Sequence, residues 1–435
     1  MKGGVTLPDY RKKQYGKKKF GKAGKPIKNP VKKERKKVKE VVFDDGLLSG
    51  TSKVKVIKGK KVERQRKLRA FIITAVIIIA SNIILSLILP VNLTENVKNL
   101  SAVLGTGSFP AELNGLSTID TKQNRSVFYI LSDTGLTAYN RSGKEVYHRL
   151  CGYENPVMSI SETRVLVYDQ GGNELSISNL KEVTNTYKSD DPITCAAIGR
   201  NGTFAVVTSS ADYASTVTVF NRKSKRLYTW NSAKEIVNNV CVSADGKKIG
   251  VSTITTANGR FSSHLYVLGF ESADPVYTLD LKEKIVISLK ASGKNLVVGA
   301  DGGYVSFINL KKNTAVTLEK ELDLSFYRSY GRKNLFVFNL SSNKSQNSVV
   351  VTDSGGNKKG EFQINETISD IQLFGSHIYC ISDTKTFVYD IDGTLVRTGE
   401  CGYGCKRLAV TGTYSVAVIT DTSMDEFDIS KKEKL

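Results

Sequence analysis

Two stretches of this chain lie 250 positions apart and align without a gap, and this repetition limits the folds open to it. Residues 131–153 read LSDTGLTAYNRSGKEVYHRLCGY and residues 381–403 read ISDTKTFVYDIDGTLVRTGECGY, with nine of 23 positions identical. Similar apolar strand cores recur at intervals of about 38 to 47 residues, the period of a four-stranded propeller blade. The eight cores are 126–133, 164–169, 203–210, 248–253, 295–301, 334–339, 377–383 and 415–420.

Each core has the same kind of neighbours. A strand and a tight glycine turn precede it, and Asn201-Gly202 and Asp245-Gly246 predict two-residue type I′ turns in which both residues have positive φ. A strand that ends in Asn or Asp follows the core, and a polar turn then leads to one more strand. The unit is therefore four strands long, and the chain is predicted to be all-β.

We predict a β-propeller over residues 116–435, with eight blades favoured. Seven blades remain possible if the weak unit 248–279, with its long loop 253–264, is not a blade. A large β-sandwich would not give this regular four-strand recurrence. The last unit has no room for its fourth strand. We expect the linker 90–115 to supply it, from the segment 97–107, and so to close the ring.

An apolar segment precedes the propeller. Residues 70–89, AFIITAVIIIASNIILSLIL, carry no charge and would span about 30 Å as a helix, which is the hydrocarbon thickness of a bilayer. A buried core helix is the alternative, and the basic residues 64–69 directly before the segment argue against it. The 69-residue leader and the lack of a small-residue cleavage site favour an uncleaved signal-anchor. The positive-inside rule then predicts a single-pass protein of the cell membrane with a cytoplasmic N-terminus and an extracytoplasmic propeller.

Residues 1–69 contain 25 Lys and Arg but only 6 Asp and Glu. Such a segment cannot bury a core, so we predict a disordered basic cytoplasmic tail. Its partner could be the anionic lipid of the membrane. Nucleic acid is a candidate partner only through this tail, where Tyr15 and Phe20 lie among the charges. The tail could also serve as a topology signal alone.

The repeat units resemble blades of WD-repeat-like and quinoprotein-like propellers, and VSADGKKIGVST (242–253) is similar to a turn frequent in both. The sequence departs from true WD repeats, because its only Trp, Trp230, is followed by Asn231. The order of basic tail, apolar segment and propeller resembles a family of single-pass bacterial membrane proteins of Gram-positive type. The resemblance implies a fold and a topology; that family has no assigned activity.

No motif of a known catalytic or metal site is present. The three histidines, His148, His264 and His377, lie in three different units. Asp390 and Asp392 precede Gly393, but a calcium loop needs its glycine two positions later. We therefore predict no catalytic, cofactor-binding or metal-binding residues, no cofactor and no enzymatic activity.

Six cysteines lie in the predicted propeller: Cys151, Cys195, Cys241, Cys380, Cys401 and Cys405. Three of them fall within strand patterns, where a cysteine serves as a small hydrophobic residue. Cys151 and Cys401 follow the fourth strand of their units and predict a shared packing position. We favour mostly free, buried thiols, with Cys401–Cys405 as the only local pair that could form a disulfide.

These features predict a membrane-anchored extracytoplasmic propeller that binds or scaffolds a protein or cell-envelope partner. Two other classes stay open: a propeller enzyme, such as a quinoprotein-like dehydrogenase or a hydrolase, and a transmembrane coupler that signals to the tail. The residues along the central channel distinguish them. Convergent carboxylates, His or Arg would favour catalysis or cofactor binding, and small apolar side chains would favour a scaffold. The oligomeric state is not predicted.

Overall fold

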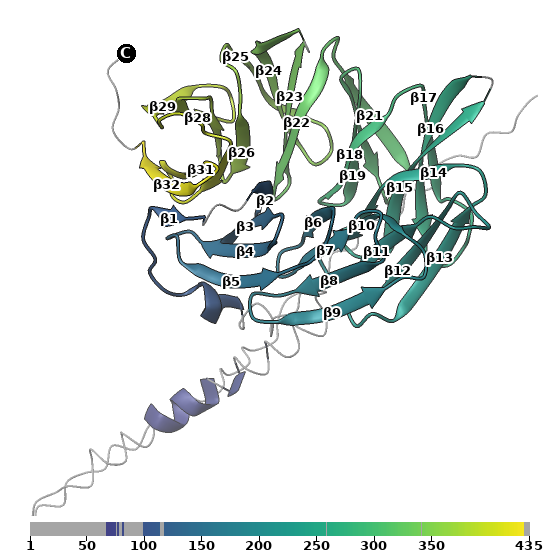
Figure 1. Ribbon diagram of the computed structural model, residues 1–435, viewed down its shortest axis with the longest axis horizontal. Helices are drawn as coiled ribbons and strands as arrows, with labels where there is room; N and C mark the ends of the chain where they lie inside the picture. Colours follow the sequence, from purple (N-terminus) through teal and green to yellow (C-terminus); the bar gives the residue numbers. More distant parts are fainter. Residues whose placement is uncertain are drawn as a thin grey trace, which may run out of the picture. The chain divides into compact units, whose positions relative to one another are not determined.

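The computed structural model describes residues 67–74, 76–77, 81, 99–113, 117–257, 259–340 and 342–429. From residue 111 onward the strands form eight antiparallel sheets of four strands each. Figure 1 shows the sheets following one another around a ring, so that β32 of the last sheet lies beside β1 and the first sheet. The prediction of an eight-bladed β-propeller is confirmed.

The first strand of each sheet lies innermost, and the fourth lies outermost. Sheets one to four are formed by β2 (Thr118–Gln123), β3 (Val127–Ser132), β4 (Gly135–Asn140) and β5 (Glu145–Leu150); β6 (Pro156–Ile160), β7 (Val165–Asp169), β8 (Glu174–Ser178) and β9 (Val183–Lys188); β10 (Ile193–Ile198), β11 (Phe204–Thr208), β12 (Ser215–Phe220) and β13 (Arg226–Ser232); and β14 (Ile236–Val242), β15 (Lys248–Ala257), β16 (Arg260–Gly269) and β17 (Tyr277–Lys282).

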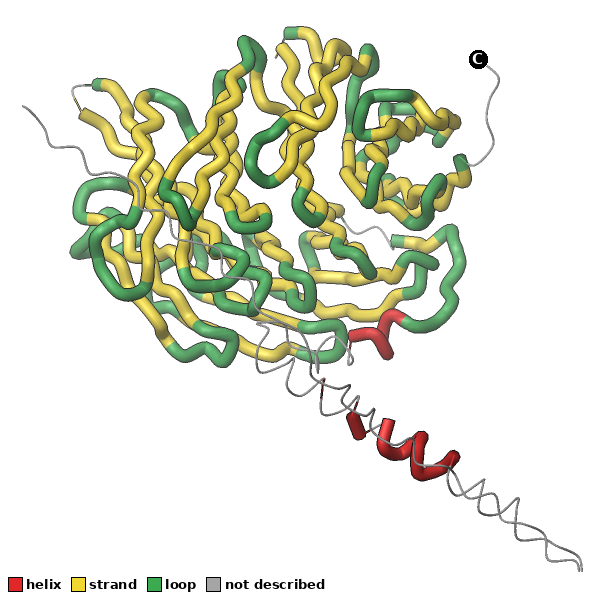
Figure 2. The backbone as a smooth tube through the Cα atoms, turned by 180° about the vertical axis from the view of Figure 1, so that it is seen from behind, coloured by secondary structure: helices red, strands yellow, loops and turns green. Residues whose placement is uncertain are grey.

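The remaining sheets continue around the ring, as the strands of Figure 2 show. Sheets five to eight are formed by β18 (Val286–Ser292), β19 (Asn295–Ala300), β20 (Tyr304–Asn309) and β21 (Thr314–Glu319); β22 (Asp323–Tyr330), β23 (Lys333–Leu340), β24 (Asn343–Asp353) and β25 (Lys358–Ile364); β26 (Asp370–Phe374), β27 (His377–Ile381), β28 (Lys385–Asp390) and β29 (Leu395–Glu400); and β30 (Arg407–Val410), β31 (Ser415–Ile419) and β32 (Ser423–Asp428), completed by β1 (Ala111–Glu112).

The weak unit 248–279 is a complete blade, sheet four. The segment 253–264, expected as a long loop, instead extends the β15–β16 hairpin, which pairs from Lys248↔Gly269 out to Ala257↔Arg260. Its Thr, Ile and Phe residues suit a pleated strand, and the chain reverses between Ala257 and Arg260.

The hydrophobic core consists of a separate cluster at each of the eight interfaces between neighbouring sheets. The cluster between the last sheet and the first contains Ala417, Ile419 and Met424 on one side and Phe128 and Ile130 on the other. Because central strands such as β3 are buried on both faces, their sequences are continuous apolar runs.

The repeated phrase is explained by one shared arrangement. The hydroxyl of Ser132 accepts a hydrogen bond from the N–H of Gly135 (3.1 Å), and that of Ser382 accepts one from Lys385 (3.1 Å). The N–H groups of Cys151 and Cys401 then bond the carbonyls of Thr134 and Thr384, both at 2.9 Å. In each copy the turn between the second and third strands therefore holds the cysteine that follows the fourth.

The predicted turn type is wrong at both Asn-Gly and Asp-Gly. Gly202 and Gly246 have positive φ, 86° and 67°, but Asn201 and Asp245 do not. The two side chains act instead as acceptors: Asn201 Oδ1 bonds the N–H of Thr203 at 3.0 Å, and Asp245 Oδ1 bonds that of Lys247 at 3.1 Å. These turns are longer than two residues and need positive φ only at the glycine.

The linker closes the ring, but not through the predicted segment. Residues 99–103 are helical, and the closing strand is β1, further along the chain, which pairs with β32 through Ala111↔Met424 and Glu112↔Ser423. The described part of the segment, 99–107, contains no strand, and two of its carbonyls are bonded by a side chain: Asn140 Nδ2 donates to the carbonyls of Val103 and Gly105, both at 2.9 Å. The side chain of Asn99 also leaves the segment, because its Nδ2 donates to Thr163 O at 3.0 Å.

The N-terminal predictions fall mostly outside the described residues. Residues 1–66 of the basic tail are not described, and of the apolar segment 70–89 only 70–74, 76–77 and 81 are, all of them helical. Within the described residues, no helix has both the length and the apolar character needed to cross a bilayer.

Candidate functional site

Charged side chains from four inner strands converge at the axis of the ring. We call Asp120 and Lys122 on β2, Lys290 on β18, Arg328 on β22 and Asp370 on β26 the axis cluster. Lys290 belongs to sheet five and Lys122 to sheet one, on opposite sides of the ring, yet the charges of Lys122 and Asp120 act on the pKa of Lys290.

The carboxylates of the axis cluster are already engaged by the protein. Asp370, which is buried, accepts hydrogen bonds from the N–H of Ile371 (2.8 Å), from Arg328 Nη2 (2.8 Å) and, from the next sheet, from the N–H of Leu408 (3.1 Å). Asp120 accepts from the N–H of Thr121 (2.8 Å) and lies 3.3 Å from Lys122 Nζ. A buried carboxylate satisfied in this way joins its own sheet to the two neighbouring sheets.

Lys290 differs from the other cations of the axis cluster, because no carboxylate of the described residues pairs with it. Its Nζ lies 4.9 Å from the ring centroid of Tyr327 in a cation–π contact. Desolvation is the main cause that lowers the pKa of Lys290 to about 7; the neighbouring charges of Arg328 and Lys122 contribute in the same direction, and that of Asp120 opposes them. Its side chain is nevertheless exposed, so water at the axis screens part of this effect.

Polar side chains also join most neighbouring inner strands. Lys122 Nζ donates to the carbonyl of Met158 on β6, and Ser159 Oγ accepts from the N–H of Ile198 on β10 at 3.2 Å. Asn238 and Asn239 donate to the carbonyl of Val286 on β18, at 3.1 and 3.0 Å. The residues along the central channel are therefore polar and charged rather than small and apolar. Most of the charged side chains, however, bond a neighbouring sheet of the ring.

The three histidines do not come together. His148 lies on the outer strand β5 with Nδ1 3.0 Å from Thr137 Oγ1. His264 lies on β16 with Nδ1 3.2 Å from Glu235, directly before β14, and His377 Nε2 lies 3.3 Å from Asp390. Among the residues that the structure describes, no three His, Cys, Asp or Glu side chains are grouped as a metal site. Asp392 closes a turn, because its Oδ1 accepts from the N–H of Thr394 at 3.0 Å.

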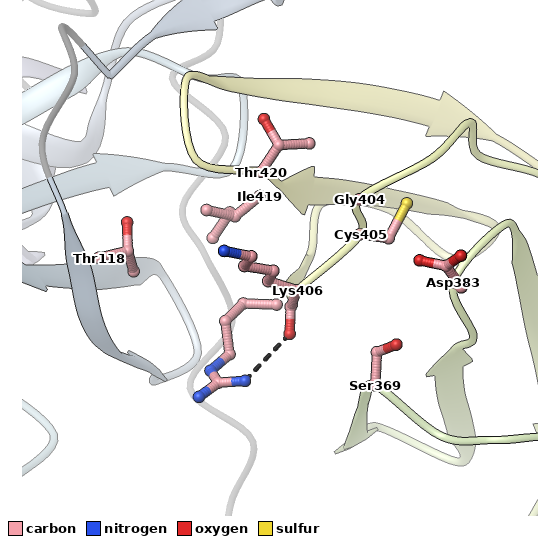
Figure 3. A pocket seen from close by; sticks show the side chains of 9 residues that line it. Thr118, Ser369, Asp383, Gly404, Cys405, Lys406, Ile419 and Thr420 are labelled. Atoms are coloured by element: carbon pink, nitrogen blue, oxygen red, sulfur yellow. Dashed lines mark hydrogen bonds between the residues drawn. The ribbon is translucent and has the colours of Figure 1, made fainter.

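A small pocket lies beside the axis, where sheets seven, eight and one meet. Its volume is about 370 Å³, and Figure 3 shows the residues around it. They are Thr118, Ser369, Asp383, Gly404, Cys405, Lys406, Arg407, Ile419 and Thr420. Lys406 Nζ is paired with the carboxylate of Asp421 at 2.6 Å, and Arg407 Nη1 donates to Lys406 O at 3.0 Å. The pocket opens on the face of the ring at which the inner strands begin.

We call this side of the ring the top face. It carries the first residues of the inner strands, the turns from second to third strands and the ends of the outer strands. Most of the strongly exposed apolar side chains of the described propeller lie on it, including Tyr403 (86% exposed), Leu150 (70%) and Ile236 (60%). The full set is Ile119, Leu150, Tyr213, Ile236, Ile285, Ile287, Leu340 and Tyr403. Sequence reasoning missed this face, because these residues are scattered over 285 positions.

The cysteines lie largely as predicted. Cys195, Cys241 and Cys380 are in strands β10, β14 and β27, and the last two are buried. Cys151 and Cys401 are both buried directly after an outer strand, so the shared packing position is confirmed. All six are free thiols in this structure, and Cys401 Sγ lies 3.0 Å from Cys405 Sγ.

The sequence profile of DUF5711, a family of unknown function, matches residues 118–429, which is almost the whole ring. The chain belongs to this family. No curated protein matches the chain.

Solved structures confirm the fold of this DUF5711 member. The computationally designed protein Ika8 is 12% identical, with a TM-score of 0.52 over 74% of this chain and 99% of its own. Sqt1 of Saccharomyces cerevisiae is 11% identical, with a TM-score of 0.51 over 75% and 100%. Sqt1 of Chaetomium thermophilum, bound to the N-terminus of the ribosomal protein L10, is 11% identical, with a TM-score of 0.50 over 74% and 100%. Identities this low show a shared fold alone.

Proposed function

We propose that this chain is a membrane-anchored, extracytoplasmic propeller that acts as a non-enzymatic binding or scaffold module for a protein or cell-envelope partner. The observation that carries this proposal is the set of exposed apolar side chains on the top face. Exposed apolar side chains that gather on one face of a soluble domain mark interaction surfaces, and aromatic residues such as Tyr403 are enriched among interface anchors.

The construction of the ring suits this role. Three of the five charged residues of the axis cluster, Lys122, Arg328 and Asp370, bond a neighbouring sheet, so the ring is a rigid support for the loops on its faces. Rigid scaffolds with exposed loops bind partners with little loss of order. Chaetomium thermophilum Sqt1 offers an example of this fold in complex with a segment of another protein.

The anchoring part of the proposal rests on residues 70–89. Where this segment is described it is helical, and Phe71, Ile72, Ile73, Val76 and Ile77 are more than half exposed. The hydroxyl of Thr74 donates to the carbonyl of Ala70 at 2.9 Å, which satisfies its only polar group inside the helix, as an apolar surrounding requires. The basic tail before it would lie on the cytoplasmic side and bind anionic lipid.

Crosslinking in native membranes tests partner binding. The double variant Leu150→Ser/Tyr403→Ser removes two exposed apolar side chains from the top face. The matched control is Val316→Ser, because Val316 is 55% exposed on the outer strand β21. We expect the double variant to lose a specific crosslinked partner that the control retains. Equal recovery of the same partners by both variants would contradict the proposal.

Lys290 favours a second candidate function, the binding of an anionic ligand at the axis. It is the cation of the axis cluster without a carboxylate partner among the described residues, and a phosphate or carboxylate group there would compensate its charge. Titration of the full-length chain with inorganic phosphate tests this. Saturable binding that is lost in Lys290→Met would support it, and weak binding that is unchanged in the variant would exclude it.

A further inference from the structure

The loop between β29 and β30 brings two sulfur atoms together. It reads Cys401-Gly402-Tyr403-Gly404-Cys405, and Gly402 and Gly404 have φ of 74° and 80°. These conformations, which favour glycine, turn the chain back on itself. Both cysteines are buried, at 4% and 3% exposure, and their Sγ atoms are 3.0 Å apart. They are the only two cysteines of the described chain whose sulfurs contact each other.

We propose that Cys401 and Cys405 are a disulfide-forming pair that closes this loop when the chain folds in an oxidising compartment. A disulfide bond is about 2.05 Å long, so the two sulfurs need to approach by only about 1 Å.

The other copy of the repeat shows that the second cysteine is not needed for the fold. Cys151, Gly152 and Tyr153 match Cys401, Gly402 and Tyr403, but the position of Cys405 is taken by Asn155. Cys151 is buried all the same, and it packs in the cluster between sheets one and two. One buried cysteine is therefore enough for packing at this place in the first copy, and Cys405 is an additional cysteine of the second copy.

The environment favours a neutral disulfide over ionised thiols. Burial raises the pKa of Cys405, and the nearby charge of Asp383 raises it too, while burial is also the main cause of the raised pKa of Cys401. Two thiols held protonated are poor metal ligands and poor nucleophiles. Their oxidation replaces two buried S–H groups by one apolar bond, and no charge has to be buried.

The reaction is a thiol–disulfide exchange with a donor disulfide, either a thioredoxin-like oxidase or an oxidised small-molecule thiol such as oxidised glutathione. The exchange takes place while the chain is still folding and the two sulfurs are exposed: one cysteine, as its thiolate, attacks the donor disulfide and releases one donor sulfur, which takes up a proton. The second cysteine then attacks the mixed disulfide and releases the other donor sulfur. Cys401 and Cys405 lose two protons and two electrons, and the donor gains them as two thiols.

Closure would fix an exposed aromatic side chain on the top face. Tyr403 lies between the two cysteines and is 86% exposed, whereas its counterpart Tyr153 is half-buried against the core. A covalently closed loop leaves Tyr403 less freedom to lose when a partner binds. This part of the inference rests on the proposed function, because it makes Tyr403 an anchor for the partner.

Alkylation and peptide mapping of the full-length chain test the inference. The reduced protein is unfolded, refolded with oxidised glutathione, and then denatured and alkylated before and after reduction. We expect Cys401 and Cys405 to be alkylated only after reduction, and Cys405 to become a free or glutathione-bound thiol in Cys401→Ser. In the matched control Cys151→Ser the crosslink should form as in the wild type. Alkylation of both cysteines in the treated wild type before reduction would overturn the inference.

A second arm separates this inference from the proposed location. Thiols are trapped by alkylation in intact cells before the protein is isolated. A crosslink between Cys401 and Cys405 in these cells supports both the pair and an oxidising compartment. Free thiols in the cells, together with a crosslink after oxidised glutathione, would contradict the extracytoplasmic location and leave the disulfide-forming pair supported.

Discussion

The side-chain amide of Gln123 makes both of its hydrogen bonds to the backbone of Val410. Gln123 Nε2 donates to Val410 O at 2.7 Å, and Gln123 Oε1 accepts from Val410 N at 2.8 Å. The two residues are 287 positions apart, on the inner strands β2 and β30 of the first and last sheets. We call the junction of the first and last sheets the seam. The amide of Gln123 closes its inner side, and the pairing of β1 with β32 closes its outer side.

Replacement of Gln123 by Ala should destabilise the ring by about 1–3 kcal/mol, because two hydrogen bonds are lost and two backbone groups lose their partners. Gln372→Ala is the control, since Gln372 is a half-buried residue of the inner strand β26 for which no side-chain hydrogen bond is seen in the described part. Urea unfolding of both variants measures the difference. Equal midpoints would show that the amide contributes nothing to closure.

Closure at the outer side of the seam depends on Leu113, which directly follows β1. Its side chain is 3% exposed in the cluster between sheets eight and one, and its N–H bonds Thr422 O at 3.0 Å. Leu113→Ala should cost about 2–5 kcal/mol, as is usual for a buried leucine. Leu104→Ala, at a site 65% exposed, should change little. Thermal unfolding compares them, and similar losses for both would argue that this cluster does not hold the ring closed.

Asp370 should be the most sensitive carboxylate of the ring. Asp370→Ala leaves Arg328 and two backbone N–H groups without their acceptor, so we expect a loss of about 3–5 kcal/mol. The exposed ion pair of Lys406 with Asp421 provides the contrast, and Asp421→Ala should cost no more than about 1 kcal/mol. A loss in Asp370→Ala as small as that in Asp421→Ala, measured by denaturant unfolding, would refute this role.

Lys290 should make the stability of the ring depend on pH. Its pKa falls to about 7 in the folded chain, from an ordinary value of 10.5, so between these values the unfolded chain binds one more proton. Stability should therefore rise as the pH increases from 7 to 10, and the penalty is fully present below pH 7. Lys290→Met removes the penalty and should stabilise the chain most at low pH. Unfolding at pH 6 and pH 9.5 measures this, and an equal gain at both values would contradict it.

The sequence predicted the eight blades because each blade repeats a long signal, an apolar core with a turn on either side. It could not locate β1, because a strand of two residues, Ala111–Glu112, has no periodicity to detect. The turns at Asn201 and Asp245 were misjudged because side-chain acceptors compete with the two-residue turn. Asp370 could have been noticed as an acidic residue within an apolar strand, whereas Lys290 and Lys122 become neighbours only when the ring closes.

The helical residues 99–103 and the loop after them change how mechanical load would reach the seam. A pull applied on the N-terminal side of Asn99 meets the bond from Asn99 to Thr163 O first, and then the two bonds from Asn140 to the carbonyls of Val103 and Gly105. These contacts pass the force into sheets one and two before it arrives at the two residue pairs of β1 and β32. Force applied to the chain before Asn99 would therefore act on these three hydrogen bonds before it reaches β1, a strand of only two residues.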